Sequence, residues 1–198
     1  MKLLFWLVIL FSFNSFAEIH YTCGSDSWNR LEFQGNMFFV EIELVCETSI
    51  DINTKDKIKS LMISRFQKAS DVTQVHEVGE RDNGTYIISN LKQSIEGRGD
   101  MNVKFEHFVE SGNGSINTTS KSLDIQATGY SRFTKEIIRK RIISEVNDKI
   151  QFIFRDFNKI QKPGIVPRSF FERSAKKGLS SNTKKKVSFL MNYLDQHL

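Results

Sequence analysis

The sequence is poor in the residues that most often carry catalysis or bind metals. It contains two cysteines, and its four histidines, His20, His76, His107 and His197, are scattered with no His-Glu-x-x-His spacing. Two distant cysteines with no histidine at ligand spacing also argue against a structural zinc site. The Gly-x-Ser-x-Gly signature of a hydrolase is missing, and Gly97-Arg98-Gly99 lacks the spacing and following helix of a dinucleotide-binding loop. The sequence therefore predicts no catalytic residue, no metal ligand and no cofactor.

Long apolar segments are also rare. The longest, residues 3–13, has eleven residues and is broken only by Ser12, which is well short of the roughly 20 that a membrane-spanning helix needs. Lys2 precedes it and the small residues Ser15 and Ala17 follow it, in the order typical of a secretory signal peptide. We therefore expect residues 1–17 to be a signal peptide and the mature chain to be periplasmic or secreted, with no transmembrane segment after cleavage. The alternative is a signal anchor that stays uncut.

The two cysteines suggest how the start of the mature chain is held. In an oxidising compartment, an isolated pair such as Cys23 and Cys46 most often forms one disulfide, and two free buried thiols are the alternative. Side chains from Phe38 to Thr48 alternate between apolar and mostly acidic, which is typical of a half-buried strand with Cys46 on its apolar face. The bond would tether residues 18–36 to this strand and stabilise the fold by about 3 kcal/mol.

Charge is unevenly distributed along the chain. Residues 18–53 carry seven acidic side chains and one arginine, whereas residues 159–198 carry nine basic side chains and two acidic ones. This asymmetry indicates either a surface for an anionic partner or a solvated helix face that offsets the acidic segment. Residues 184–186, with Lys176 and Lys177, could make peripheral contact with an anionic membrane surface. We expect no nucleic-acid partner, because the compartment is wrong and no aromatic-basic motif appears.

Beyond the first strand, hydrophobic spacing predicts one short helix and a series of strands. Asn53 is placed to cap a helix whose apolar residues, from Ile58 to Phe66, recur at helical spacing. Asp82-Asn83-Gly84 is a hairpin signal between residues 72–81 and 85–95. Further strands are expected at residues 101–110, 115–120, 133–146 and 149–158, while residues 121–130 show no clear pattern.

The chain ends in a predicted long helix. Ser169 and Glu172 are spaced as a capping box, and an apolar stripe with helical spacing continues to the C-terminus. Gly178 lies within this segment, so we expect either one long helix or two nearly collinear ones.

Two local patterns carry a resemblance to a known superfamily. The first is the passage from Cys46-Glu47-Thr48-Ser49-Ile50-Asp51-Ile52-Asn53-Thr54 through the short helix to Val72-Thr73-Gln74-Val75. The second is Pro163-Gly164-Ile165-Val166-Pro167, which leads into the terminal helix. Both are similar in rhythm to the START-like (helix-grip) superfamily, which also contains polyketide cyclases and coenzyme Q-binding proteins. The likeness covers residues 37–197, and the segment before Phe38 has no counterpart in it.

The resemblance implies an α+β fold over residues 37–198. A curved antiparallel sheet of about six to seven strands would grip the long C-terminal helix, with the short helix after the first strand. Between sheet and helix it implies an elongated cavity that binds a lipid or another apolar small molecule, as in a carrier or sensor.

Candidate ligand-binding residues follow from this arrangement. Small helix residues would make room for the ligand, and aromatic residues on alternating strand positions would form the sheet wall. The candidates are Phe105, His107, Phe152, Phe154, Phe171, Ala175, Gly178 and Leu179. One alternative is an interaction module whose core is filled and whose basic helix meets an acidic partner. Another is a cyclase-like enzyme, which would require a polar cluster around His107 acting as acid or base.

Overall fold

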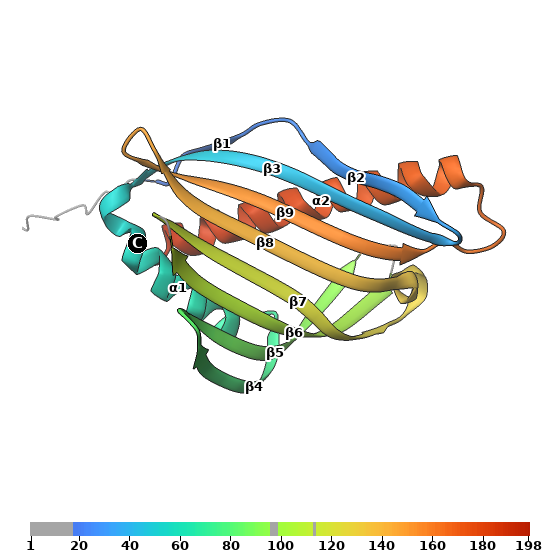
Figure 1. Cartoon of the computed structure of the whole chain (residues 1–198), viewed down its shortest axis with the longest axis horizontal. Helices are drawn as coiled ribbons and strands as arrows, with labels where there is room; N and C mark the ends of the chain where they lie inside the picture. The colour runs from blue at the N-terminus through green and yellow to red at the C-terminus, as the bar shows by residue number, and fades with distance from the viewer. Residues whose placement is uncertain (1–17, 96–98, 113) are drawn as a thin grey trace, which may run out of the picture.

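A computed structural model describes residues 18–95, 99–112 and 114–198, which form a large curved antiparallel sheet and two α-helices (Figure 1). The predicted signal peptide lies outside these residues and stays a prediction, and so does the predicted turn at Gly97 and Arg98. Within the described ranges, no helix has the length and apolar character needed to cross a membrane.

The sheet has nine strands in the described part of the chain. Its order is β1-β3-β9-β8-β7-β6-β5-β4, with β2 also beside β3, and all neighbours are antiparallel. The prediction of a curved antiparallel sheet is confirmed, and the strands from β3 onward number seven. The strand bounds are Tyr21–Cys23 (β1), Ser27–Gln34 (β2), Met37–Asp51 (β3), Val72–Arg81 (β4), Gly84–Ile95 (β5), Gly99–Gly112 (β6), Ser115–Ala127 (β7), Thr134–Val146 (β8) and Lys149–Gln161 (β9).

The N-terminal segment supplies the two strands that the sequence did not predict. Both β1 and β2 pair with the same edge of β3, one after the other. Cys23 lies directly opposite Cys46, with their Cα atoms 4.0 Å apart, and the two form the predicted disulfide. Residues 18–36 are therefore part of the sheet, and the disulfide fastens β1 to it.

The short helix follows β3 as predicted, with a different cap. Asp51 accepts a hydrogen bond from the Asn53 backbone N–H at 2.8 Å, so Asp51, and not Asn53, starts the turn. A 3-10 turn, η1 (Ile52–Thr54), then leads into α1 (Lys55–Lys68). Apolar residues at helical spacing, Ile58, Met62 and Phe66, are buried as α1 packs against β4, β5 and β6.

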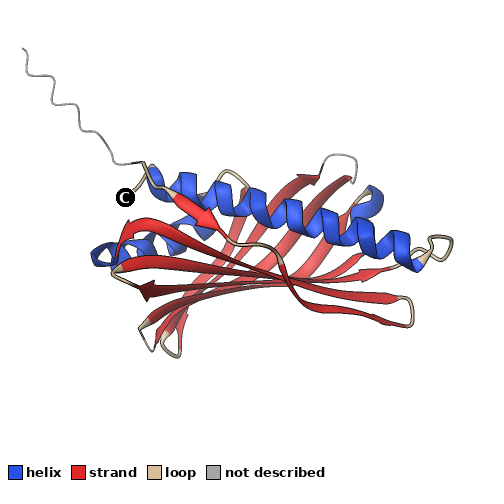
Figure 2. Cartoon of the chain, turned by 90° about the horizontal axis from the view of Figure 1, so that it is seen from above, coloured by secondary structure: helices blue, strands red, loops and turns tan. Residues whose placement is uncertain are grey.

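The C-terminal segment forms one uninterrupted helix, α2 (Arg168–Asp195), which runs along one face of the sheet (Figure 2). Gly178 does not break it. The predicted capping box is wrong, because the helix begins before Ser169 and its N-cap residue, Pro167, has no side chain that can accept a hydrogen bond. Helix and curved sheet together make the helix-grip arrangement that the resemblance implies.

Three apolar clusters form the core. The largest lies beneath the C-terminal half of α2, where Val187, Leu190 and Leu194 pack with Phe152 and Phe154. A second joins Ala175 and Leu179 of α2 to β3, and a third is built on β5, β6 and β8 around Met101, Phe105 and Ile137. Residues of the second and third clusters face each other across an open space. The N-terminal half of α2 therefore packs on β3 but is separated from Met101 and Ile137 by this space.

Candidate functional site

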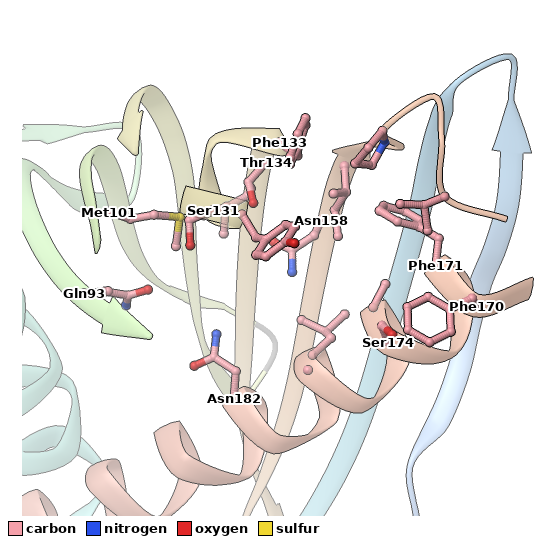
Figure 3. A pocket seen from close by; sticks show the side chains of 18 of the residues that line it. Gln93, Met101, Ser131, Phe133, Thr134, Asn158, Phe170, Phe171, Ser174 and Asn182 are labelled. Carbon is pink, nitrogen blue, oxygen red and sulfur yellow. The ribbon is translucent and has the colours of Figure 1, made fainter. Parts of the chain in front are cut away.

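The open space is a cavity of about 450 Å³ between the N-terminal part of α2 and the sheet (Figure 3). Its walls come from α2, from β5, β6, β8 and β9, and from η2 (Gly129–Phe133), the 3-10 turn before β8. The volume lies within the roughly 300–1,000 Å³ of small-molecule sites in proteins.

Small residues on α2 keep the cavity open. Ser174, Gly178 and Asn182 lie four residues apart on one face of the helix, and all three line the cavity beside Ala175. One turn farther on, the inward residues become large, as Val187, Leu190 and Met191 are buried against the sheet. Glycine inside a helix is about 1 kcal/mol less favourable than alanine. Gly178 therefore weakens the helix at the position where a side chain would enter the cavity.

The cavity has an exposed aromatic rim and a buried apolar wall. Tyr130 on η2 and Phe170 on α2 line it, yet these two side chains are 70% and 65% exposed. Met101, Ile137 and Leu179 line its interior and are almost completely buried. An apolar molecule entering between Tyr130 and Phe170 would meet a largely apolar surface.

Charged and amide side chains line the opposite end. Arg139 of β8 and Lys186 of α2 reach the cavity, together with Gln93 and Asn182, and the last two point into it in Figure 3. Arg139 is only 9% exposed, and its Nη2 donates to Gln93 Oε1 at 3.1 Å. Its Nε is buried and has no hydrogen-bond partner within the described residues. The guanidinium also lies 4.7 Å from the centre of the Phe105 ring.

Next to this end, Asp156 of β9 joins the helix to the sheet. Its Oδ2 accepts hydrogen bonds from Thr183 at 2.9 Å and from Lys186 at 3.0 Å. Its Oδ1 forms an ion pair with Arg141 at 2.7 Å, without the angle of a hydrogen bond. Burial alone would raise the pKa of Asp156, but the charges of Arg141, Lys186 and Arg139 outweigh burial and hold this pKa well below its usual range.

The cations of this cluster lose charge more readily than they would in water. Burial is the main cause, and it lowers the pKa of Lys186 to about 7, with the charge of Arg139 adding to the effect. Burial likewise lowers the pKa of Arg139 to about 10. The polar end of the cavity is therefore lined by buried cationic groups, Arg139 in full and Lys186 in part at neutral pH.

The structure separates the eight candidate residues into two groups. The four helix residues, Phe171, Ala175, Gly178 and Leu179, all line the cavity. Phe152 and Phe154 pack instead beneath the C-terminal half of α2, where large side chains leave no room, and Phe105 lies in the cluster behind Arg139. Ligand contact stays a prediction for all eight.

His107, the remaining candidate, is a buried core residue. Its Nδ1 lies 2.8 Å from Ser120 Oγ and its Nε2 3.1 Å from Ser89 Oγ, and its ring stacks on Phe66 with centroids 4.1 Å apart. Burial, followed by the charges of Arg139 and Arg65, lowers its pKa to about 3. The polar surroundings that an enzyme would need are present, but the imidazole is neutral, 1% exposed and enclosed by its serine partners.

Sequence reasoning missed the charged end of the site. Arg139 and Arg141 occupy alternate positions of β8 between Ile137 and Ile143, and all four are buried. Asp156 continues the inward row of β9 after Phe154 in the same way. Side chains alternate between the two faces of a sheet along each strand, and this alternation was the signal that could have placed Arg139, Arg141 and Asp156 on the buried face.

Similarities to known proteins come from solved structures. Comparison with protein-family models gave no match, and neither did comparison with curated proteins. Among solved structures, the chain is similar to a STAR-related lipid transfer protein from Xanthomonas axonopodis, with 14% identity, 79% of this chain and 98% of that chain covered, and a TM-score of 0.41. It is also similar to the Zhui aromatase/cyclase from Streptomyces (10% identity, 79% and 92% covered, TM-score 0.49) and to the lipid transfer and protein localization domain of human StarD13 (11% identity, 84% and 88% covered, TM-score 0.46).

The sheet order and the long terminal helix described above give the chain a helix-grip fold.

Proposed function

We propose that this chain binds a lipid or another apolar molecule in the cavity between α2 and the sheet, as a carrier or sensor. The observation that carries the proposal is the ligand-sized space of about 450 Å³ beneath the small residues of α2. An interaction module with a filled core would need large side chains at these positions, as α2 has them beneath its C-terminal half. The exposed Tyr130 and Phe170 supply an apolar way in.

Binding is proposed here in preference to catalysis. His107, the histidine that an enzyme would need, is held between two serines in the core, whereas the cavity is lined by apolar, amide and cationic groups. Such a lining selects ligands by shape and by a few polar contacts.

The proposed place of action is the periplasm or the exterior of the cell. The Cys23–Cys46 disulfide supports this, because disulfides form and persist in oxidising compartments. The apolar and small residues of the first seventeen positions are a second, independent support from the sequence.

Peripheral contact with an anionic membrane surface also stays a proposal. Of the lysines predicted for it, Lys184 pairs with Asp26 at 3.0 Å and Lys186 is turned inward to Asp156. Lys176 lies 5.0 Å from the Trp28 ring, while Lys177 and Lys185 are exposed. A membrane would therefore meet fewer free charges than the sequence indicates.

Filling the cavity tests the binding proposal. In Gly178→Leu, a side chain would occupy the space beneath α2, and we expect the affinity for a neutral apolar fluorophore, N-phenyl-1-naphthylamine, to fall about tenfold or more. Leucine is a better helix former than glycine by up to about 1 kcal/mol, so a binding loss caused by unfolding is not expected. Fluorescence titration measures the affinity, and urea unfolding measures the stability.

Ser181→Leu is the matched control, because it adds the same side chain to an exposed position of the same helix. It should bind the fluorophore as the unsubstituted chain does. Equal affinity of Gly178→Leu and Ser181→Leu would contradict the proposed site, and absence of fluorophore binding by the unsubstituted chain would contradict the proposed function.

A further inference from the structure

The buried end of the cavity holds a guanidinium whose hydrogen bonds are incomplete. Arg139 is 9% exposed, its Nη2 donates to the neutral amide oxygen of Gln93, and its buried Nε has no acceptor within the described residues. A guanidinium has five N–H donors and stays charged in proteins. A buried charge of this kind is unfavourable unless it is paired.

Charges in the surrounding protein leave the site electropositive. Asp156 and Asp71 are the carboxylates that act on Arg139, and Arg141 and Arg65 are the neighbouring arginines. Asp156 Oδ2 accepts from Thr183 and Lys186, and its Oδ1 forms an ion pair with Arg141. With Lys186 protonated, four cations therefore share two carboxylates, and the buried Nε atoms of Arg139 and Arg65 have no hydrogen-bond partner within the described residues. Of these two arginines, Arg139 lines the cavity.

Amide side chains border the charged end of the cavity, and mainly apolar residues line the rest of it. Gln93 and Asn182 flank the region into which Arg139 and Lys186 reach. From there the lining proceeds along α2 past Leu179 and Ala175 to the aromatic rim, and the polar residues on this part of the lining are Ser131, Thr134, Asn158 and Ser174. The cavity is thus charged at one end and mainly apolar over the rest of its length.

We propose that the ligand is a single-chain amphiphile with a carboxylate head group, which binds head first. Its carboxylate would accept from Arg139 at the buried end, flanked by Asn182, and its hydrocarbon chain would run along α2 toward Tyr130 and Phe170. A planar carboxylate matches the fork of N–H donors on a guanidinium, and such charge-assisted pairs are about twice as strong as neutral hydrogen bonds. This inference rests on the proposed function and specifies its ligand class.

Hexadecanoic acid and hexadecan-1-ol test it, because they share one chain and differ in the head group. Displacement of bound N-phenyl-1-naphthylamine is measured at about pH 8, where the free acid is ionised. We expect the unsubstituted chain to bind the acid at least about tenfold more tightly than the alcohol. In Arg139→Met, which keeps an unbranched side chain and removes the charged guanidinium, the acid should lose this advantage while the alcohol binds as before.

Each outcome bears on a separate claim. Equal affinities for acid and alcohol in the unsubstituted chain would overturn the carboxylate inference and leave the apolar site standing, and this comparison needs no variant to fold. An acid preference that persists in a folded Arg139→Met would overturn the role of Arg139. Failure of both ligands to displace the bound fluorophore would overturn the proposed ligand class, whereas failure of the fluorophore to bind would overturn the proposed function itself.

Discussion

Replacement of Asp156 by asparagine should destabilise the fold more than any other single charge removal in the described chain. The carboxylate is 1% exposed and holds Thr183, Lys186 and Arg141 at 2.9, 3.0 and 2.7 Å. Asparagine has nearly the same shape and can still accept from Thr183. The variant Asp156→Asn therefore removes the charge while it keeps the packing.

The expected loss is about 3–5 kcal/mol, the usual effect of leaving buried charges without their partner. Arg141 and Lys186 have side chains that are 9% and 18% exposed, so water can screen them only in part. Whole domains are stable by only about 5–15 kcal/mol. Asp156→Asn should therefore shift the urea midpoint strongly, measured by circular dichroism at neutral pH.

Two comparisons make the result specific to the buried charge. Asp26→Asn removes the carboxylate from the pair with Lys184, whose side chain is 57% exposed, and should cost less than about 1 kcal/mol. The double variant Asp156→Asn/Lys186→Met should recover part of the loss, since one unpaired cation is then absent. A loss below about 1 kcal/mol in Asp156→Asn, or no recovery in the double variant, would refute the view that this carboxylate balances the cations.

The remaining predictions concern the disulfide and the buried histidine. Removing both sulfurs in Cys23→Ala/Cys46→Ala should lower the free energy of unfolding by about 3 kcal/mol, and equal urea midpoints of the unsubstituted chain with and without reductant would contradict this. The pKa of His107 is about 3 in the folded chain against 6.5 for the free side chain. Below about pH 6.5, His107 therefore binds a proton in the unfolded chain but stays neutral in the folded chain. Stability should therefore be fully present above about pH 6.5 and decline as the pH falls toward 3; in His107→Gln this decline should be smaller, and an unchanged profile in urea unfolding at several pH values would count against a neutral buried imidazole.

Local signals predicted most of the sheet, and their failures have local reasons. Alternation and the Asp82-Asn83-Gly84 turn located β4 and β5 to within a residue or two. Residues 121–127 showed no pattern because they are mostly exposed in β7 and are held by pairing with β6. The strands β1 and β2 are held by pairing with β3 and, for β1, by the disulfide. These are contacts with another segment, which the local sequence of β1 and β2 does not reveal.

The site was harder to predict than the sheet. Alternation indicates which face a strand residue occupies, but the helix residue opposite decides whether that face meets a ligand or the core. Phe152 and Phe154 face inward like Ile137, yet they lie beneath Val187 and Leu190 and not beneath Gly178. The helix candidates were easier to place because small residues at one-turn spacing mark the hollow stretch directly.

One arrangement of charges connects the grip on the helix with the proposed ligand site. Asp156 binds Thr183 and Lys186 at the point where α2 passes from close packing to the cavity. Arg139 lies directly opposite Asp156 in the β8–β9 pairing. The Asp156 carboxylate is held by Thr183, Lys186 and Arg141, however, and Arg139 donates to Gln93. An incoming carboxylate at the polar end of the cavity would give the Arg139 guanidinium a charged acceptor in addition to the neutral amide of Gln93.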